Sequence, residues 1–276
     1  MRKTVVLLLV LFTATVASLD RAAQACGPDT DCMVGKNRHY RIKMPEGHDG
    51  KTKVGAIIFA HGYRGSAAGA MRNEHLGRMA SDLGVALVAV KSYRDDWRIP
   101  GVPRNTGTDG SLEFDYFDAV VADLGSRFAI DTNRLLMTGF SAGGMMVWNL
   151  ACHRSTLFAG FVPMSGTFWR PEPETCDSPS ASILHIHGDS DPVVPLTGRK
   201  IADTHQGDVR TVLDMYAGYG GFGTAKPEIR DDWRCETRTN TAGQFLDFCL
   251  FEGGHSFKTT YVRRAWERFE AAGLLQ

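Results

Sequence analysis

The pentapeptide G-F-S-A-G at residues 139–143 is the feature that most constrains the fold of this chain. It follows the apolar run L-L-M at residues 135–137 and precedes a stretch with helical character. A serine in a sharp turn between a strand and a helix stands above the edge of a sheet, so Ser141 is a candidate nucleophile. The alternative is a glycine-rich turn whose serine only caps the next helix.

Two further motifs lie downstream in the order that a serine hydrolase on a parallel sheet requires, an acid and then a histidine. The apolar run at residues 183–187 leads into G-D-S-D-P-V-V-P, which contains Asp189 and Asp191. The motif G-G-H-S-F then places His255 between a strand-like run at 245–251 and an amphipathic segment. Catalytic groups of open parallel sheets gather at the carboxyl ends of the strands. We therefore expect Ser141, a carboxylate and His255 to meet at this edge.

An earlier motif, H-G-Y-R-G-S at residues 61–66, follows the apolar run at 54–60. Hydrolysis of an acyl group needs backbone N–H donors directed at the oxygen on which negative charge develops. The N–H groups of Ala142, just after the nucleophile, and of Tyr63, in this early loop, are the predicted oxyanion hole.

Together these four motifs resemble the esterase family of polyhydroxybutyrate depolymerases and bacterial feruloyl esterases, within the α/β-hydrolases. The resemblance extends from about Arg41 to the C-terminus. It implies Ser141 as nucleophile, Asp191 as acid and His255 as base of a serine carboxylesterase that works through an acyl-enzyme. The implied substrates are hydroxyalkanoate oligomers of the polyhydroxybutyrate type, or feruloyl and acetyl esters.

Alternating apolar segments independently indicate an α/β fold. Strands are expected at residues 37–44, 54–60, 85–90 and 158–164, and helices at 71–83, 113–128, 141–151 and 259–271. Such alternation requires a mostly parallel sheet with helices on both faces. The 276 residues are 43% hydrophobic, as expected for a single globular domain. The prediction is an α/β-hydrolase fold in one catalytic domain.

Two long segments between the expected elements, residues 92–111 and 166–182, should overhang the catalytic edge and determine substrate choice. Trp97 and Trp169 lie within them and are candidate substrate-binding residues. The alternative for each is packing in the core, which is more common for an aromatic side chain.

For both the acid and the base, the sequence contains a second candidate residue. Asp191 precedes Pro192, whose ring favours an extended conformation at Asp191. Asp189 is expected instead to accept hydrogen bonds from backbone amides of the turn. His205 also follows the acid, but it lies in a polar segment with helical character, so His255 is the preferred base.

A metal site is the main competing interpretation, because His185-x-His187-x-Asp189 has the spacing of ligands in dinuclear metallohydrolases. Alternate positions of a strand place both imidazoles on one face. However, Ser190 stands where that motif continues with another histidine. We therefore expect His185 to be a core residue, His187 to lie near the active edge, and the reaction to use no metal and no cofactor.

The first 25 residues have the features of a signal peptide: basic residues at 2–3, an apolar run at 5–16 and A-Q-A at 23–25. The apolar run is too short for a transmembrane helix, which needs roughly 20 residues. We expect export to the periplasm or the medium, cleavage after Ala25 and a catalytic domain over residues 26–276. Lipid anchoring through Cys26 is not expected, because alanine occupies the position where lipidation sites usually have leucine.

All six cysteines follow the predicted cleavage site, which indicates disulfides in an oxidising compartment. Several connectivities are possible. Proximity along the chain favours Cys26–Cys32, Cys152–Cys176 and Cys235–Cys249.

The formal net charge is zero and the sequence has no sustained basic run. Nucleic acid and anionic membrane surfaces are therefore not expected partners. The expected partner is a small or oligomeric ester, and the sequence does not indicate an oligomeric state. Two other functions share the same motifs: a peptidase on the same triad, and a binding protein that kept the fold without turnover.

Overall fold

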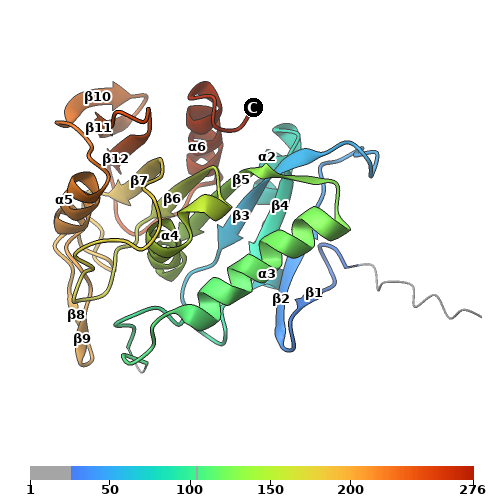
Figure 1. Ribbon diagram of the computed structural model, residues 1–276, viewed down its shortest axis with the longest axis horizontal. Helices are drawn as coiled ribbons and strands as arrows, with labels where there is room; N and C mark the ends of the chain where they lie inside the picture. The colour runs from blue at the N-terminus through green and yellow to red at the C-terminus, as the bar shows by residue number, and fades with distance from the viewer. Residues whose placement is uncertain (1–25, 104) are drawn as a thin grey trace, which may run out of the picture.

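Within residues 26–103 and 105–276, which the computed structural model describes, ten strands form one sheet at the centre of the molecule (Figure 1). The strands are β1 (Cys32–Val34), β2 (Arg38–Lys43), β3 (Val54–Ala60), β4 (Ala86–Val90), β5 (Ile130–Phe140), β6 (Gly160–Met164), β7 (Ile183–Gly188), β10 (Lys226–Arg230), β11 (Trp233–Thr239) and β12 (Phe245–Phe251). The predicted signal peptide lies outside the described residues.

The sheet has the order β1-β2-β4-β3-β5-β6-β7-β12-β11-β10. The six central strands, from β4 to β12, run parallel, whereas both edges are antiparallel. Parallel strands point their carboxyl ends to one edge of the sheet. The turns after β3, β5, β7 and β12, which contain the four motifs, therefore lie at that edge.

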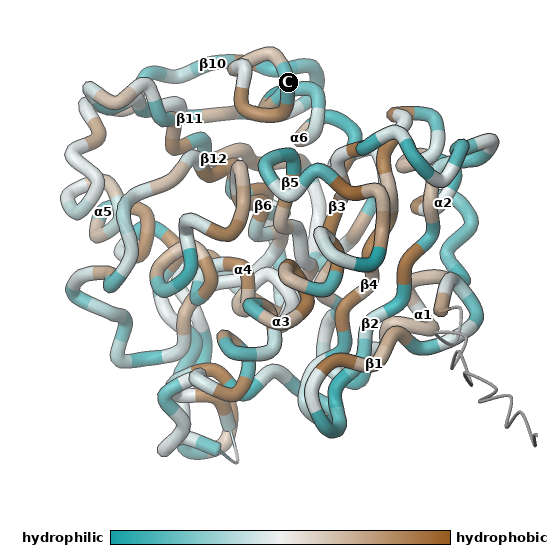
Figure 2. The backbone as a smooth tube through the Cα atoms, turned by 45° about the vertical axis from the view of Figure 1, so that its right-hand side comes forward, coloured by the Kyte–Doolittle hydropathy of each residue, from teal (hydrophilic) through white to brown (hydrophobic). Residues whose placement is uncertain are grey.

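Helices cover both faces of the sheet, as predicted. They are α1 (Ala67–Met71), α2 (Glu74–Asp82), α3 (Ser111–Arg127), α4 (Ala142–His153), α5 (Val209–Tyr219) and α6 (Thr259–Ala271), with a 3-10 turn at Ser155–Leu157. The buried side chains of α3, α4 and α5 form one core, and those of α2 and α6 form the other. Strand β3 contributes Ile58 to the first core and Ile57 to the second, because successive side chains of a strand point to opposite faces. Figure 2 shows the apolar central strands enclosed by more hydrophilic loops.

The helix expected at residues 71–83 begins later in the structure, as α2 at Glu74, and Met71 is the last residue of the separate helix α1. The side chain of Asn73 accepts a hydrogen bond from the N–H of Leu76 at 3.1 Å, which caps a new helix at Glu74. The segment around His205 is not helical either, because His205 belongs to β9 (Thr204–His205), which pairs with β8 (Lys200–Ile201). Helix α5 begins only after the cap at Asp208.

The three cysteine pairs favoured by proximity are the three disulfides of the structure. Cys152–Cys176 joins the end of α4 to the segment that follows β6, and Cys235 and Cys249 are opposite each other on β11 and β12. Within the described part of the chain, no helix has the length and apolar character needed to cross a membrane.

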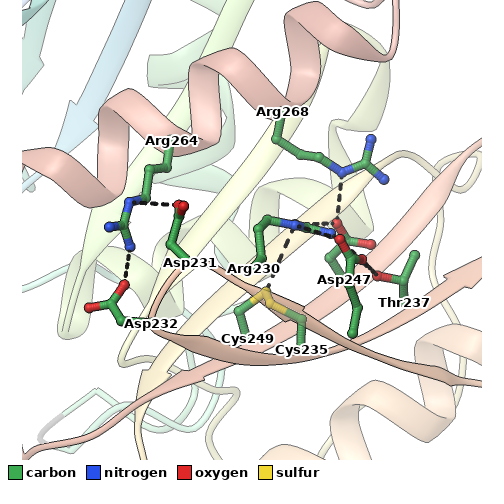
Figure 3. Close-up of a disulfide and its surroundings, with 10 residues drawn as sticks. Arg230, Asp231, Asp232, Cys235, Thr237, Asp247, Cys249, Arg264 and Arg268 are labelled. Atoms are coloured by element: carbon green, nitrogen blue, oxygen red, sulfur yellow. Dashed lines mark hydrogen bonds and ion pairs between the residues drawn. A yellow bond between two sulfur atoms is a disulfide. The ribbon is translucent and has the colours of Figure 1, made fainter.

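A buried carboxylate beside the third disulfide connects β12 with β10 and α6 (Figure 3). Asp247 has no exposed surface, and its Oδ2 accepts hydrogen bonds from Arg230 Nη1 and Arg268 Nε, both at 2.9 Å. Two guanidinium groups thus compensate one buried charge, which fixes the strand that leads to His255.

Candidate active site

The predicted strand-turn-helix around Ser141 is present. Strand β5 ends at Phe140, α4 begins at Ala142, and Ser141 between them has φ 59° and ψ −123°. A backbone conformation of this kind costs a residue other than glycine about 1–3 kcal/mol, so the surrounding structure must enforce it. The enforcement comes from close packing, because a Cβ atom added to Gly143 would lie 2.0 Å from the carbonyl oxygen of Ala60 in β3.

Asp191 and His255 are directly hydrogen-bonded. His255 Nδ1 lies 2.7 Å from Asp191 Oδ2, while Asp191 Oδ1 accepts the N–H groups of Val193 and Val194 at 2.8 and 2.9 Å. Burial raises the pKa of the Asp191 carboxyl, but the hydrogen bonds from His255, Val194 and Val193 outweigh burial and hold this pKa below its ordinary value. An ionised carboxylate only accepts hydrogen bonds, so the proton lies on His255 Nδ1.

The imidazole of His255 also contacts the turn that contains Ser141. Its ring packs on that of Phe140, the residue before Ser141, with ring centroids 4.6 Å apart. Since Nδ1 is directed at Asp191, Nε2 is the ring nitrogen that can act as a base. The turns after β5, β7 and β12 thus bring Ser141, Asp191 and His255 to one end of the sheet.

Asp189 does not bond to His255. Its Oδ2 accepts a hydrogen bond from Arg234 Nη2 at 2.7 Å and its Oδ1 accepts one from the N–H of Gly253 at 3.1 Å. The hydrogen bond from Arg234, followed by that from Gly253, lowers the pKa of this carboxyl. Asp189 thus links the turn after β7 to the loop of His255, where a bond to amides of its own turn was expected.

The loop after β3 lies against the turn that contains Ser141. A Cβ atom added to Gly62 would be 3.9 Å from Ser141 Oγ. His61 Nδ1 donates a hydrogen bond to the carbonyl oxygen of Gly62 at 2.7 Å. In a trans peptide the following N–H points opposite to the C=O, so the N–H of Tyr63 is directed away from His61. The N–H of Ala142, in the first turn of α4, has no acceptor within its own helix.

His61 has no role in the predicted site, yet its hydrogen bonds hold this loop against the neighbouring segment that contains Ser92 and Trp97. Its Nε2 accepts the N–H of Ser92 at 3.2 Å, and its carbonyl oxygen accepts Trp97 Nε1 at 2.8 Å. Burial lowers the pKa of His61 to about 4, so the ring is neutral and serves as both donor and acceptor. In the sequence, the only indication of this supporting role is that His61 directly precedes Gly62 in the motif H-G-Y-R-G-S.

The two tryptophans differ in position. Trp97 is 1% exposed and packs on His61 and Phe117, so it lies in the core and the expectation that it lines a pocket is not supported. Trp169 is 7% exposed and pairs with Gln206 through an isolated β-bridge. Its Nε1 has no hydrogen-bond partner within the described residues, and its role in substrate binding stays a prediction.

The loop that contains Trp97 is fixed by Glu113, a further residue that the predicted site lacks. Glu113 is fully buried in α3, and its Oε1 accepts the N–H groups of Tyr93 and Arg98 at 3.2 and 3.0 Å. Its Oε2 accepts Arg38 Nη2 at 2.6 Å. The sequence indicates this role of Glu113 only weakly: it is a charged residue in a helix whose other sheet-facing residues are mostly apolar.

The histidines of the rejected metal motif bond to each other. His185 Nε2 lies 2.9 Å from His187 Nδ1, and both side chains are buried. Among the residues that the structure describes, no group of three histidine, cysteine, aspartate or glutamate side chains could hold a metal ion. The expectation that His185 is a hydrogen-bonded core residue is confirmed.

Comparisons with known proteins agree with this geometry. Residues 114–213 match the phospholipase/carboxylesterase family. The chain is 29% identical to "Putative esterase NocK" of Nocardia uniformis subsp. tsuyamanensis over 62% of its own length, and it spans 50% of that relative. It is 31% identical to "Probable feruloyl esterase C" of Aspergillus terreus, with 68% of this chain and 70% of the relative aligned.

A solved structure shows the same fold. An acetyl xylan esterase from Aspergillus awamori matches with a TM-score of 0.60 at 16% identity, over 89% of this chain and 96% of that one. The parallel sheet, the helices on both faces and the similarity to the Aspergillus terreus protein lead to one assignment. The chain belongs to the α/β-hydrolase esterase family and is a serine carboxylic ester hydrolase.

Proposed function

We propose that Ser141, His255 and Asp191 are the catalytic triad of this esterase. His255 removes the proton of the Ser141 hydroxyl as Oγ attacks the ester carbonyl, and Asp191 stabilises the resulting imidazolium. His255 then gives this proton to the leaving alcohol, and the acyl group remains on Ser141. Water, activated by the same imidazole, attacks the acyl-enzyme and releases the acid.

The oxyanion of each tetrahedral intermediate is bound by the N–H groups of Ala142 and Tyr63. The hydrogen bond from His61 to the carbonyl oxygen of Gly62 supports this role, because it orients the Gly62–Tyr63 peptide. Preorganised amides of this kind are effective because they need not reorient as charge develops. Removing one such donor typically slows turnover about 10²- to 10³-fold.

The observation that most supports the triad is the bond between His255 and Asp191, with the same imidazole packed on Phe140 beside the strained Ser141. Replacing Ser141 by alanine should therefore lower kcat about 10⁴-fold or more without loss of folding. Ser126→Ala, an exposed serine on α3, is the matched control and should leave kcat unchanged. More than a hundredth of the wild-type kcat in Ser141→Ala would contradict the assignment.

For the substrate, we propose feruloyl or acetyl esters, in line with the names of the Aspergillus relatives. Initial rates on methyl ferulate, on acetylated xylan and on a soluble 3-hydroxybutyrate oligomer test this, with Ser141→Ala as the blank. Turnover of the oligomer alone would move the substrate to hydroxyalkanoate esters. Turnover of peptides without any ester hydrolysis would support the peptidase alternative instead.

We further propose that the protein is exported and that residues 26–276 are the mature domain. Three disulfides support an oxidising compartment. The pairing of Cys26 with Cys32 also leaves no thiol at Cys26 for a lipid. The N-terminal sequence and mass of the protein from the periplasm or medium should begin at Cys26, and a mature chain that retains the first residues would contradict this proposal.

A further inference from the structure

Three buried side chains that the proposed reaction does not use form a continuous chain of hydrogen bonds. Trp148 Nε1 donates to His185 Nδ1 at 3.0 Å, His185 Nε2 lies 2.9 Å from His187 Nδ1, and His187 Nε2 lies 2.8 Å from the carbonyl oxygen of Val194. All three side chains have no exposed surface. A series of hydrogen bonds of this length in an apolar core would destabilise the fold unless every donor and acceptor in it had a partner.

The direction of every bond in this chain is determined. An indole N–H can only donate, so His185 accepts at Nδ1 and, as a neutral ring, donates from Nε2. His187 therefore accepts at Nδ1 and donates from Nε2. A carbonyl oxygen can only accept, so the assignment from the Val194 end agrees with that from the Trp148 end. Burial lowers the pKa of both histidines, which keeps them neutral.

This series of hydrogen bonds connects two parts of the proposed site whose spacing must stay fixed, the helix after Ser141 and the turn that contains Asp191. Trp148 belongs to α4, the helix that begins directly after Ser141, whereas Val194 belongs to the turn of the acid. The N–H of Val194 donates to Asp191 Oδ1 at 2.9 Å, while its carbonyl oxygen accepts from His187. His187 Nε2 is also 3.6 Å from Asp191 Oδ2.

We propose that His185 and His187 form a relay that positions Asp191 relative to the nucleophile helix, with Trp148 setting the direction of its hydrogen bonds. This rests on the proposed triad. The two histidines are positioning residues, because they act through Val194 and Asp191 and do not reach the reacting atoms. The relay keeps the Asp191 carboxylate in the plane and at the distance that the His255 imidazole requires.

A double-mutant cycle between His187→Leu and Asp191→Asn tests the relay, with kcat and KM measured on the ester that the wild-type protein hydrolyses fastest. His187→Leu should lower kcat about 10- to 100-fold with little change in KM, as expected when a catalytic group is displaced by about 1 Å. In the Asp191→Asn background the same substitution should have less than about a twofold effect, because the group that it positions is gone.

A role in folding alone would lower kcat by the same factor in both backgrounds, which would overturn the relay. So would a wild-type kcat in His187→Leu. Wild-type kcat in Asp191→Asn alone would instead overturn the proposed triad, so the two failures are distinct. His153→Leu, on the same helix α4 but bonded to exposed Asp177, is the control and should keep kcat.

If His187→Leu does not fold, as judged by circular dichroism, Trp148→Phe replaces it in the cycle. This variant removes one donor but keeps an aromatic ring against Phe168 and Tyr216. Loss of the single indole hydrogen bond should lower kcat about 3- to 10-fold. An unchanged kcat, or an equal fall in the Asp191→Asn background, would overturn the relay.

Discussion

Replacing Gly143 by alanine should displace Ser141, the proposed nucleophile, from Asp191 and His255. The added Cβ would lie 2.0 Å from the carbonyl oxygen of Ala60 and 2.8 Å from that of His61. Close carbon-oxygen contacts in proteins are about 3.3–3.6 Å, so α4 and β3 must separate by about 1.3 Å. Both oxygens belong to rigid backbone, which leaves no flexible side chain to absorb the change.

The substitution should lower both the catalytic rate and the stability. A misplacement of about 1 Å can cost about 10²-fold in rate, so kcat/KM on p-nitrophenyl acetate should fall by at least this factor. Overpacking in a core typically costs about 1–3 kcal/mol, which corresponds to a fall in Tm of roughly 2–10 °C for a chain of this size.

Gly218→Ala is the matched control. Gly218 lies within α5, and a Cβ atom added there would have no neighbour within 4 Å. Alanine in a helix interior is favoured over glycine by about 0.5–1 kcal/mol, so this variant should be slightly more stable and equally active. A kcat/KM for Gly143→Ala close to that of Gly218→Ala would refute the steric argument for the pentapeptide.

Two further predictions concern stability. Because buried His61 stays neutral to about pH 4, while a histidine in the unfolded chain binds its proton from 6.5 downward, the unfolded state gains protons first as the pH falls. The free energy of unfolding, measured in urea, should therefore fall between pH 6.5 and 4 by about 1.4 kcal/mol per pH unit for this residue alone, and a constant value across this window would contradict its burial. Asp247→Asn should cost about 3–5 kcal/mol because it removes the buried charge that faces two arginines, whereas Asp214→Asn, in an exposed pair with Arg238, should cost less than about 1 kcal/mol. Equal losses in these two variants would contradict the importance of the buried pair.

The central strands and the order of the motifs could be predicted because they depend on local sequence. A strand buried on both faces is a continuous apolar run, as in β3 and β4, and the pentapeptide around Ser141 indicates a strand-turn-helix. Strand β11 and the edge strand β10 could not be predicted in this way. Strand β10 is largely exposed along its length and lacks an apolar pattern.

The residues that support the site could not be predicted from the sequence for a different reason. His61 acts through Ser92 and Trp97, which are 31 and 36 positions away, and no local pattern encodes such a contact. Trp97 is only a candidate substrate-binding residue from the sequence, because it lies in a long loop, and the structure shows the alternative, packing in the core against His61 and Phe117. The strands and helices can be predicted from the periodicity of apolar residues, but the residues that hold a site in place depend on contacts between distant segments of the chain.

The disulfide Cys152–Cys176 has a consequence for access to the proposed site at Ser141. It fastens the segment after β6 to the end of α4, while a Cβ atom added to Gly166, near the start of this segment, would lie 2.5 Å from the backbone of Gly144 in the same helix. A segment fixed at two points to one helix moves with that helix and cannot swing away as a lid. The site is then preorganised, and a substrate loses little free energy to the ordering of this segment when it binds. If this segment contacts the substrate, as we propose, selectivity among esters depends on the fit of the substrate to a fixed surface, and reduction of the disulfide should broaden that selectivity.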